Sequence, residues 1–97
     1  RKSMIIQREE HGSKGAFFIQ EQGERQAEMT YTMAGPQRMI IDHTEVADAL
    51  RGKSAGKQLV SAAVEYARAN QLKIIPLCPF AKAVFDKTPS FQDVLNQ

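Results

Sequence analysis

The sequence predicts an α+β fold in which a mixed sheet carries a helix on one face. Four β-like segments follow one another before residue 47, and the third alternates strictly between apolar and polar residues. An amphipathic segment, residues 54–70, then precedes a fifth apolar run at residues 72–77. A helix commonly connects two parallel strands, so we expect the fifth strand to lie parallel to the fourth.

The first half of the chain is expected to form an antiparallel meander. Residues 4–8 and 17–21 are short β-like runs, and the turn-forming residues 11–15 separate them. Residues 25–33 present one apolar face, which is formed by Ala27, Met29, Tyr31 and Met33. Core packing is the favoured role of this stripe, with pocket lining as the alternative. Residues 38–46 are apolar at first and polar toward their end. Such a strand either places side chains in a functional site or has an end that is exposed to solvent.

The segment after the fourth strand is expected to be a loop followed by a long helix. The loop covers residues 47–53 and contains Gly52. In residues 54–70 the apolar side chains recur at helical spacing, and the stripe consists of Leu59, Val60, Ala63, Val64, Tyr66 and Ala67. Asn70 is a plausible end of this helix.

The C-terminal part is expected to add a buried strand and short helices. Pro76 lacks an N–H group, so the strand at residues 72–77 must lie at an edge or carry a bulge. Residues 79–87 begin with proline, which suits the first turn of a helix. Ser90 is expected to cap a last helical turn. The phenylalanines that should pack these helices onto the sheet are Phe80, Phe85 and Phe91.

Length and charge exclude several classes of protein. A chain of 97 residues has room for one domain, and no apolar run approaches the roughly 20 residues that cross a bilayer. Residues 1–50 hold six Lys/Arg and eight Asp/Glu, a net charge of −2, whereas residues 51–97 hold seven and three, a net charge of +4. Four charges are too few to indicate nucleic acid, and a small molecule that bears phosphate fits them better.

Cys78 is the single cysteine of the chain. One thiol excludes an internal disulfide and, with two histidines, argues against a metal site. A free thiol persists in a reducing compartment, and no long apolar segment follows the N-terminal basic residues. We therefore expect a cytoplasmic protein that does not bind membranes.

The loop before the long helix is the strongest candidate for a binding site. The unpaired N–H groups of a helix N-terminus suit phosphate, and Gly52 and Gly56 would let a ligand approach the backbone closely. Arg51, Lys53 and Lys57 add positive charge around the same point. The spacing is neither that of a Walker A loop nor that of a G-x-G-x-x-G motif. An ordinary basic helix start is the alternative to pyrophosphate binding.

The pattern Arg51-x-x-Ser54-x-Gly56 resembles the [Q/R]-x-x-G-x-[G/A] motif of the GNAT-superfamily acyltransferases. Val46 stands where the fourth strand of that family commonly ends in valine. More narrowly, residues 43–46, the loop and residues 74–80 together resemble the small, stand-alone, bacterial YjdJ-like branch. The resemblance spans about residues 15–95 and implies a GNAT-like mixed sheet with C-terminal helices, so that residues 1–97 would form one minimal acyl-CoA-binding domain.

The resemblance also implies a cofactor and its contacts. Acetyl-CoA would place its pyrophosphate on the loop, its pantetheine arm beside the strand end at Thr44 and Val46, and its thioester between the fourth and fifth strands. The loop residues that would bind the cofactor are Arg51, Gly52, Lys53, Ser54, Ala55, Gly56 and Lys57.

Two departures from the family pattern bear on this interpretation. Ser54 replaces the first glycine of the motif, so its backbone must adopt a negative φ or accept strain. Phe85 stands where many GNAT enzymes carry a tyrosine that protonates the thiolate, and the long N-terminal helices of the family are missing. These departures favour the alternative of a non-catalytic module that binds or senses acyl-CoA.

Cys78, His43 and Glu45 are the candidate catalytic residues. Cys78 precedes an expected helix N-terminus, a setting that favours a thiolate able to accept an acyl group, although a free cysteine is more often a buried hydrophobe. His43 and Glu45 should share a strand face and could take a proton from an acceptor or from Cys78, whereas Asp42 should face the other way. A hydrogen-bonded strand-end histidine and a solvated glutamate are the alternatives.

We therefore expect acetyl transfer to an unknown amine or thiol, through Cys78 if the thiol takes part. The partners would be acetyl-CoA and a small-molecule or protein acceptor, without nucleic acid, and the chain would be a monomer or weak homodimer. A salt-sensitive nucleic-acid-binding protein is the second alternative.

Overall fold

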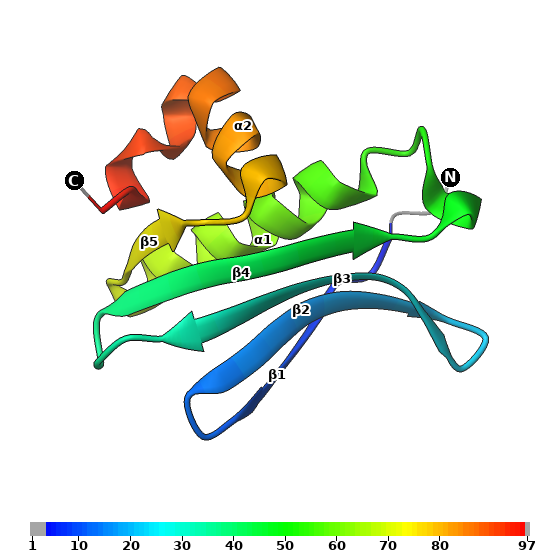
Figure 1. Cartoon of the computed structure of the whole chain (residues 1–97), viewed down its shortest axis with the longest axis horizontal. Coiled ribbons are helices and arrows are strands. Elements are labelled where there is room, and N and C mark those ends of the chain that lie inside the picture. The colour runs from blue at the N-terminus through cyan, green and yellow to red at the C-terminus, as the bar shows by residue number, and fades with distance from the viewer. Residues whose placement is uncertain (1–3, 97) are drawn as a thin grey trace.

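The computed structural model describes residues 4–96 and contains one five-stranded sheet. The strands lie side by side in chain order (Figure 1) and comprise β1 (Gln7–His11), β2 (Lys14–Glu21), β3 (Glu24–Met33), β4 (Arg38–Val46) and β5 (Lys73–Pro76). The first four are antiparallel to their neighbours, and β5 is parallel to β4. The predicted fold class and strand directions are confirmed.

Within residues 4–96, two α-helices and two 3₁₀-helices accompany the sheet, and they are η1 (Asp48–Leu50), α1 (Ala55–Asn70), α2 (Pro79–Lys87) and η2 (Pro89–Val94). Figure 1 shows α1 running along the sheet, with α2 and η2 beside β5. The predicted end of α1 at Asn70 is confirmed, because Gln71 adopts a left-handed conformation that stops the helix. Ser90 does not cap η2, which begins at Pro89 without a side-chain cap. In the part of the chain that the structure covers, no helix is long and apolar enough to cross a membrane.

The first strand lies further along the chain than residues 4–8. The polar residues of β1 pair with β2 through to His11 opposite Lys14, so the turn shrinks to Gly12 and Ser13. Gly12 has φ +64°, a conformation that glycine adopts without strain. Met4 and Ile6 are partly buried against the core, so their apolar character reflects packing rather than strand pairing.

The core lies between α1 and the sheet. Most of the predicted apolar face of β3 is buried, with Met29 and Tyr31 both at 0 % exposure, whereas Met33 is half-buried. The α1 residues that are also 0 % exposed are Leu59, Val60, Ala63, Val64 and Ala67. Burial of these side chains supplies most of the driving force that holds α1 on the sheet.

Tyr31 belongs to this core and reaches its edge through its hydroxyl group. The hydroxyl donates to Glu10 at 2.8 Å and accepts from Arg8 at 2.7 Å. The Tyr31 ring crosses Gly15, where a Cβ atom would lie only 2.3 Å from the ring. Burial, followed by the bond to Glu10, raises the pKa of Tyr31 to about 12. Core packing, rather than pocket lining, is thus the role of this residue.

The C-terminal segment covers part of the outer edge of β5. Pro76 lies on this edge strand, as its missing N–H group requires. Leu95 forms a bridge to Ile74, and the Asn96 amide donates to the Ile74 carbonyl at 2.9 Å. Backbone groups of β5 are therefore paired on both sides at Ile74.

Candidate functional site

The parallel strands β4 and β5 separate beyond Ile41. The amides of Leu77 and Cys78 both donate to the Ile41 carbonyl at 3.2 Å, and the chain then leaves the sheet to enter α2. β4 continues to Val46 and stays paired with β3 over this stretch. The edge of β4 formed by residues 42–46 thus lies past the end of its pairing with β5.

A bulge in β4 changes the side-chain alternation at the same place. Thr30 pairs with His43 and Tyr31 pairs with Ile41, so Asp42 is an additional residue in β4. Thr32, which lies on the same face of β3 as Thr30, donates to Asp42 at 2.8 Å. Asp42 and His43 therefore lie on the same face of the sheet. The expectation that Asp42 points away from His43 is wrong, because it assumed an unbroken period of two.

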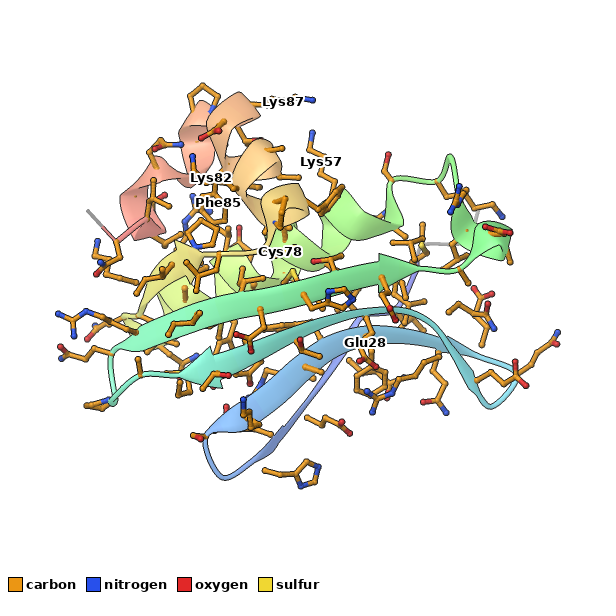
Figure 2. All side chains as sticks on the ribbon, in the orientation of Figure 1. Glu28, Lys57, Cys78, Lys82, Phe85 and Lys87 are labelled. Atoms are coloured by element: carbon orange, nitrogen blue, oxygen red, sulfur yellow. The ribbon has the colours of Figure 1, made fainter. Side chains whose placement is uncertain are left out.

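Thr44 and Cys78 meet where the strands separate. The bulge turns Thr44 to the face opposite His43, and its hydroxyl oxygen lies 3.4 Å from the Cys78 sulfur, which donates to it. Cys78 is 4 % exposed and is the residue immediately before α2. Figure 2 shows Cys78 at the junction of β5 and α2, next to β4. The thiol thus has one polar partner in an otherwise apolar setting.

His43 and Glu45 form a pair of their own. Their side chains share a face of β4 as expected, and His43 Nε2 lies 3.2 Å from a Glu45 carboxylate oxygen. Both side chains are largely exposed, at 64 % and 76 %. Since Thr44 between them contacts Cys78, His43 and Glu45 point away from the thiol. The structure therefore does not bring these two residues to Cys78.

The loop before α1 has a backbone conformation that leaves amide groups free to bind an anion. Gly52 has φ +79° and Ser54 has φ +60°, so Ser54 adopts the left-handed conformation rather than a negative φ. No side chain caps the helix. Among the described residues, the amides of Ala55, Gly56 and Lys57 have no hydrogen-bond acceptor. Amides left open in this way attract an anionic ligand.

The residues that carry these amides line a cavity of about 390 Å³ between α1 and α2. The predicted cofactor residues that line it are Val46, Arg51, Gly52, Ser54, Ala55, Gly56 and Lys57. Thr44 and Lys53 are not part of its lining. The cavity extends from the end of β4 over the first turn of α1.

The opposite wall of the cavity was not expected from the sequence. It comes from α2 and the residue after it, and consists of Phe80, Val84, Lys87 and Thr88. Phe80 is 42 % exposed, so it packs less deeply than predicted, whereas Phe85 is buried as expected and lies against Phe91. A Cβ atom on Gly56 would lie 2.6 Å from the Phe80 ring, so the glycine permits the two helices to meet.

The charged residues around the cavity all carry the same sign. Arg51, Lys57 and Lys87 line it, and no carboxylate does so. Arg51 also forms an ion pair with Asp48, whose carboxylate oxygen lies 3.1 Å from Arg51 Nε, but Asp48 itself does not line the cavity. The rest of the wall is largely apolar. The arrangement suits a ligand that has an apolar part and several negative charges. In the described residues, no three His, Cys, Asp or Glu side chains are grouped to hold a metal ion.

Comparison with known proteins identifies the family. A family model described as GCN5-related N-acetyl-transferase matches residues 16–94. The solution structure of a GCN5-like protein from Staphylococcus aureus is 40 % identical, with 96 % of this chain and 88 % of that chain covered and a TM-score of 0.73. No curated protein sequence matches the chain.

More distant structures share the fold alone. A ribosomal-protein-alanine N-acetyltransferase from Brucella melitensis biovar Abortus is 16 % identical, with 77 % of this chain and 62 % of that chain covered and a TM-score of 0.64. AAC(6′)-Iy, solved with a bisubstrate analogue that contains CoA, is 9 % identical, with coverage of 90 % and 65 % and a TM-score of 0.54. The family model spans most of the chain, and the 40 % identical structure covers nearly all of it, so the chain belongs to the GCN5-related N-acetyltransferase family.

Proposed function

We propose that the chain binds acetyl-CoA in the cavity between α1 and α2 and transfers the acetyl group to an amine or thiol acceptor. The observation that carries the proposal is the row of open amides at Ala55, Gly56 and Lys57, in a cavity whose charged lining is wholly cationic. The diphosphate of the cofactor would accept hydrogen bonds from these amides. The separated edge of β4 from Thr44 to Val46 would pair with the pantetheine arm.

Cys78 is the proposed first acceptor of the acetyl group. In this step the thiolate of Cys78 attacks the thioester carbonyl carbon, a new carbon–sulfur bond forms, and the bond to the CoA sulfur breaks. The CoA thiolate leaves and takes up a proton from solvent, and the Cys78 proton passes to solvent. An acceptor amine then displaces the Cys78 sulfur. Support comes from the position of the thiol at the point where β4 and β5 separate.

The pair His43 and Glu45 is proposed to act on the acceptor rather than on Cys78. It lies on the face of β4 away from the thiol and is open to solvent. An imidazole supported by a carboxylate suits removal of a proton from an incoming ammonium group.

A module that binds acyl-CoA without turnover is the second candidate. Phe85 favours it, because this side chain is 1 % exposed, packs against Phe91 and has no proton to give to a leaving thiolate. Incubation with acetyl-CoA alone separates the two candidates. Release of CoA thiol with an acetyl adduct on Cys78 supports transfer, whereas saturable binding without release supports the module.

NMR titration with CoA tests the binding site itself. The amide signals of Ala55, Gly56 and Lys57 are expected to shift most, and those of the turn glycines Gly12 and Gly23 are expected to stay in place. Native mass spectrometry should show one cofactor per chain, in a monomer or weak homodimer. Unchanged signals at Ala55 to Lys57 in the presence of excess CoA would refute both candidates.

A further inference from the structure

Two lysines from different helices, Lys57 and Lys87, line the cavity and define what is here its mouth. Lys57 lies in the first turn of α1 and Lys87 is the last residue of α2, and both line the cavity and are exposed. In the view of Figure 2 the Lys57 side chain, from α1, and the Lys87 side chain, from the end of α2, point toward each other. Among the described residues, neither forms an ion pair, whereas Lys82 on the same helix as Lys87 lies 3.3 Å from Asp86.

Two ammonium groups that line one cavity without a carboxylate repel each other, and an anion bound between them would offset this repulsion. Hydrogen bonds at the end of α2 also make this position more favourable for an anion. Two carbonyls of its last turn are occupied: the Thr88 hydroxyl donates to the Val84 carbonyl at 2.7 Å, and the Gln92 side-chain amide donates to the Phe85 carbonyl at 2.8 Å. Bonds of this kind reduce the negative potential that a helix C-terminus would otherwise present.

The length of α2 separates this charged mouth from the thiol. Cys78 precedes the helix and Lys87 ends it, and nine helical residues span about 13 Å. If the thioester lies at the Cys78 end and the diphosphate on the amides of α1, the remaining part of the cofactor must leave through the mouth. That part is the adenosine, whose ribose carries a phosphate monoester at its 3′ position.

We infer that Lys57 and Lys87 together bind the 3′-phosphate of CoA, and that the protein therefore selects CoA over 3′-dephospho-CoA. This inference rests on the proposed function, because it concerns the same cavity. The 3′-phosphate site is formed by side chains from both helices, in contrast to the diphosphate site, which is formed by backbone amides. Binding there would also hold the end of α2 against the start of α1.

Calorimetric titration with CoA and with 3′-dephospho-CoA tests the inference. The wild-type protein should bind CoA about tenfold more tightly, as expected for charge-assisted hydrogen bonds. Lys87→Ala and Lys57→Ala should each weaken CoA binding by about fivefold to tenfold, and Lys87→Ala should leave binding of 3′-dephospho-CoA within twofold. Lys87→Arg should keep the preference. Lys82→Ala removes the same charge from the same helix outside the cavity and should change neither affinity.

The outcomes distinguish this inference from the proposed function. Equal affinities of the wild-type protein for the two ligands would overturn the inference and leave the proposed function intact. The inference would also be overturned if Lys87→Ala weakened the binding of CoA and of 3′-dephospho-CoA by the same factor. If neither ligand binds and the amides of α1 do not respond, both the inference and the proposed function fail.

Discussion

The Cys78 sulfur lies 3.4 Å from the Thr44 hydroxyl oxygen, across the gap that opens between β5 and β4. This contact joins residues that are 34 positions apart in the chain, and it forms because the bulge at Asp42 turns Thr44 toward the thiol. Once the thiol has lost its proton, the hydroxyl can donate to the sulfur. We therefore expect Thr44 to act as a positioning residue in the proposed acetyl transfer.

Replacement of Thr44 by valine should slow acetylation of Cys78 by roughly fivefold to tenfold, because one hydrogen bond to a charged sulfur is lost. The measurement is the rate at which the acetyl adduct forms, followed by mass spectrometry. Thr44→Ser keeps the hydroxyl and should retain most of the rate. A rate for Thr44→Val equal to that of the wild-type protein would show that the contact has no role in the reaction.

His43→Gln is expected to leave that same rate unchanged. The side chain points to the opposite face of β4 from Thr44 and is 64 % exposed, so it does not reach the sulfur. The substitution should slow only the later transfer of the acetyl group from Cys78 to an amine. This step is measured as the decay of the Cys78 acetyl adduct in the presence of a primary amine. A loss of Cys78 acetylation in this variant would return His43 to the role of base for the thiol.

Ser54→Gly should stabilise the protein. A left-handed backbone costs a residue with a side chain about 1–2 kcal/mol, and the Ser54 side chain makes no capping bond that would offset this cost. Glycine loses more chain entropy on folding, so the net gain should be about 0.5–1 kcal/mol, or ~4 °C in thermal unfolding. Ser54→Ala keeps the Cβ atom and serves as the control. Equal melting temperatures for all three proteins would contradict the assignment of strain to Ser54.

Gly56→Ala should narrow the cavity. The new Cβ atom would lie 2.6 Å from the Phe80 ring, which must swing away from α1. Since Phe80 is partly exposed, the loss of stability should stay near 1 kcal/mol, while CoA affinity should fall more than tenfold. The double variant with Phe80→Ala relieves the clash and should recover the stability. If the single variant binds CoA as tightly as the wild type, close approach at Gly56 is not required.

Tyr31 should make stability depend on pH in alkaline solution. The unfolded chain releases the phenolic proton near pH 10, whereas burial raises the pKa of Tyr31 in the folded protein to about 12. The folded state therefore holds more protons between these values, and the free energy of unfolding should fall as pH rises from 10 to 12. Urea unfolding of wild type and Tyr31→Phe should show their difference shrinking over this range. A constant difference would mean that the hydroxyl is not buried as described.

The order and direction of the strands could be predicted because the patterns that set them are local. The alternation in β3 and the helical stripe of α1 are each complete within one segment, and the buried residues follow them closely. The boundaries of β4 and α2 were predicted as the structure has them. Glycines and cations in one short loop likewise indicated one wall of the cavity.

Features that depend on distant contacts could not be predicted in this way. The bulge at Asp42 exists only through the register of β4 against β3, and an unbroken alternation gives no sign of it. The wall of the cavity that α2 contributes, including Lys87, forms only when α2 packs against α1. The one available signal was a lysine at the end of a short helix in the positively charged half of the chain, and many surface helices share it.

The strand at the rim of the sheet has a further consequence for how the protein behaves at high concentration. Leu95 and Asn96 occupy part of the outer side of β5, so another chain cannot extend the sheet there by adding a strand of its own. Leu95 and Asn96 therefore oppose fibrous self-association through this edge of the sheet.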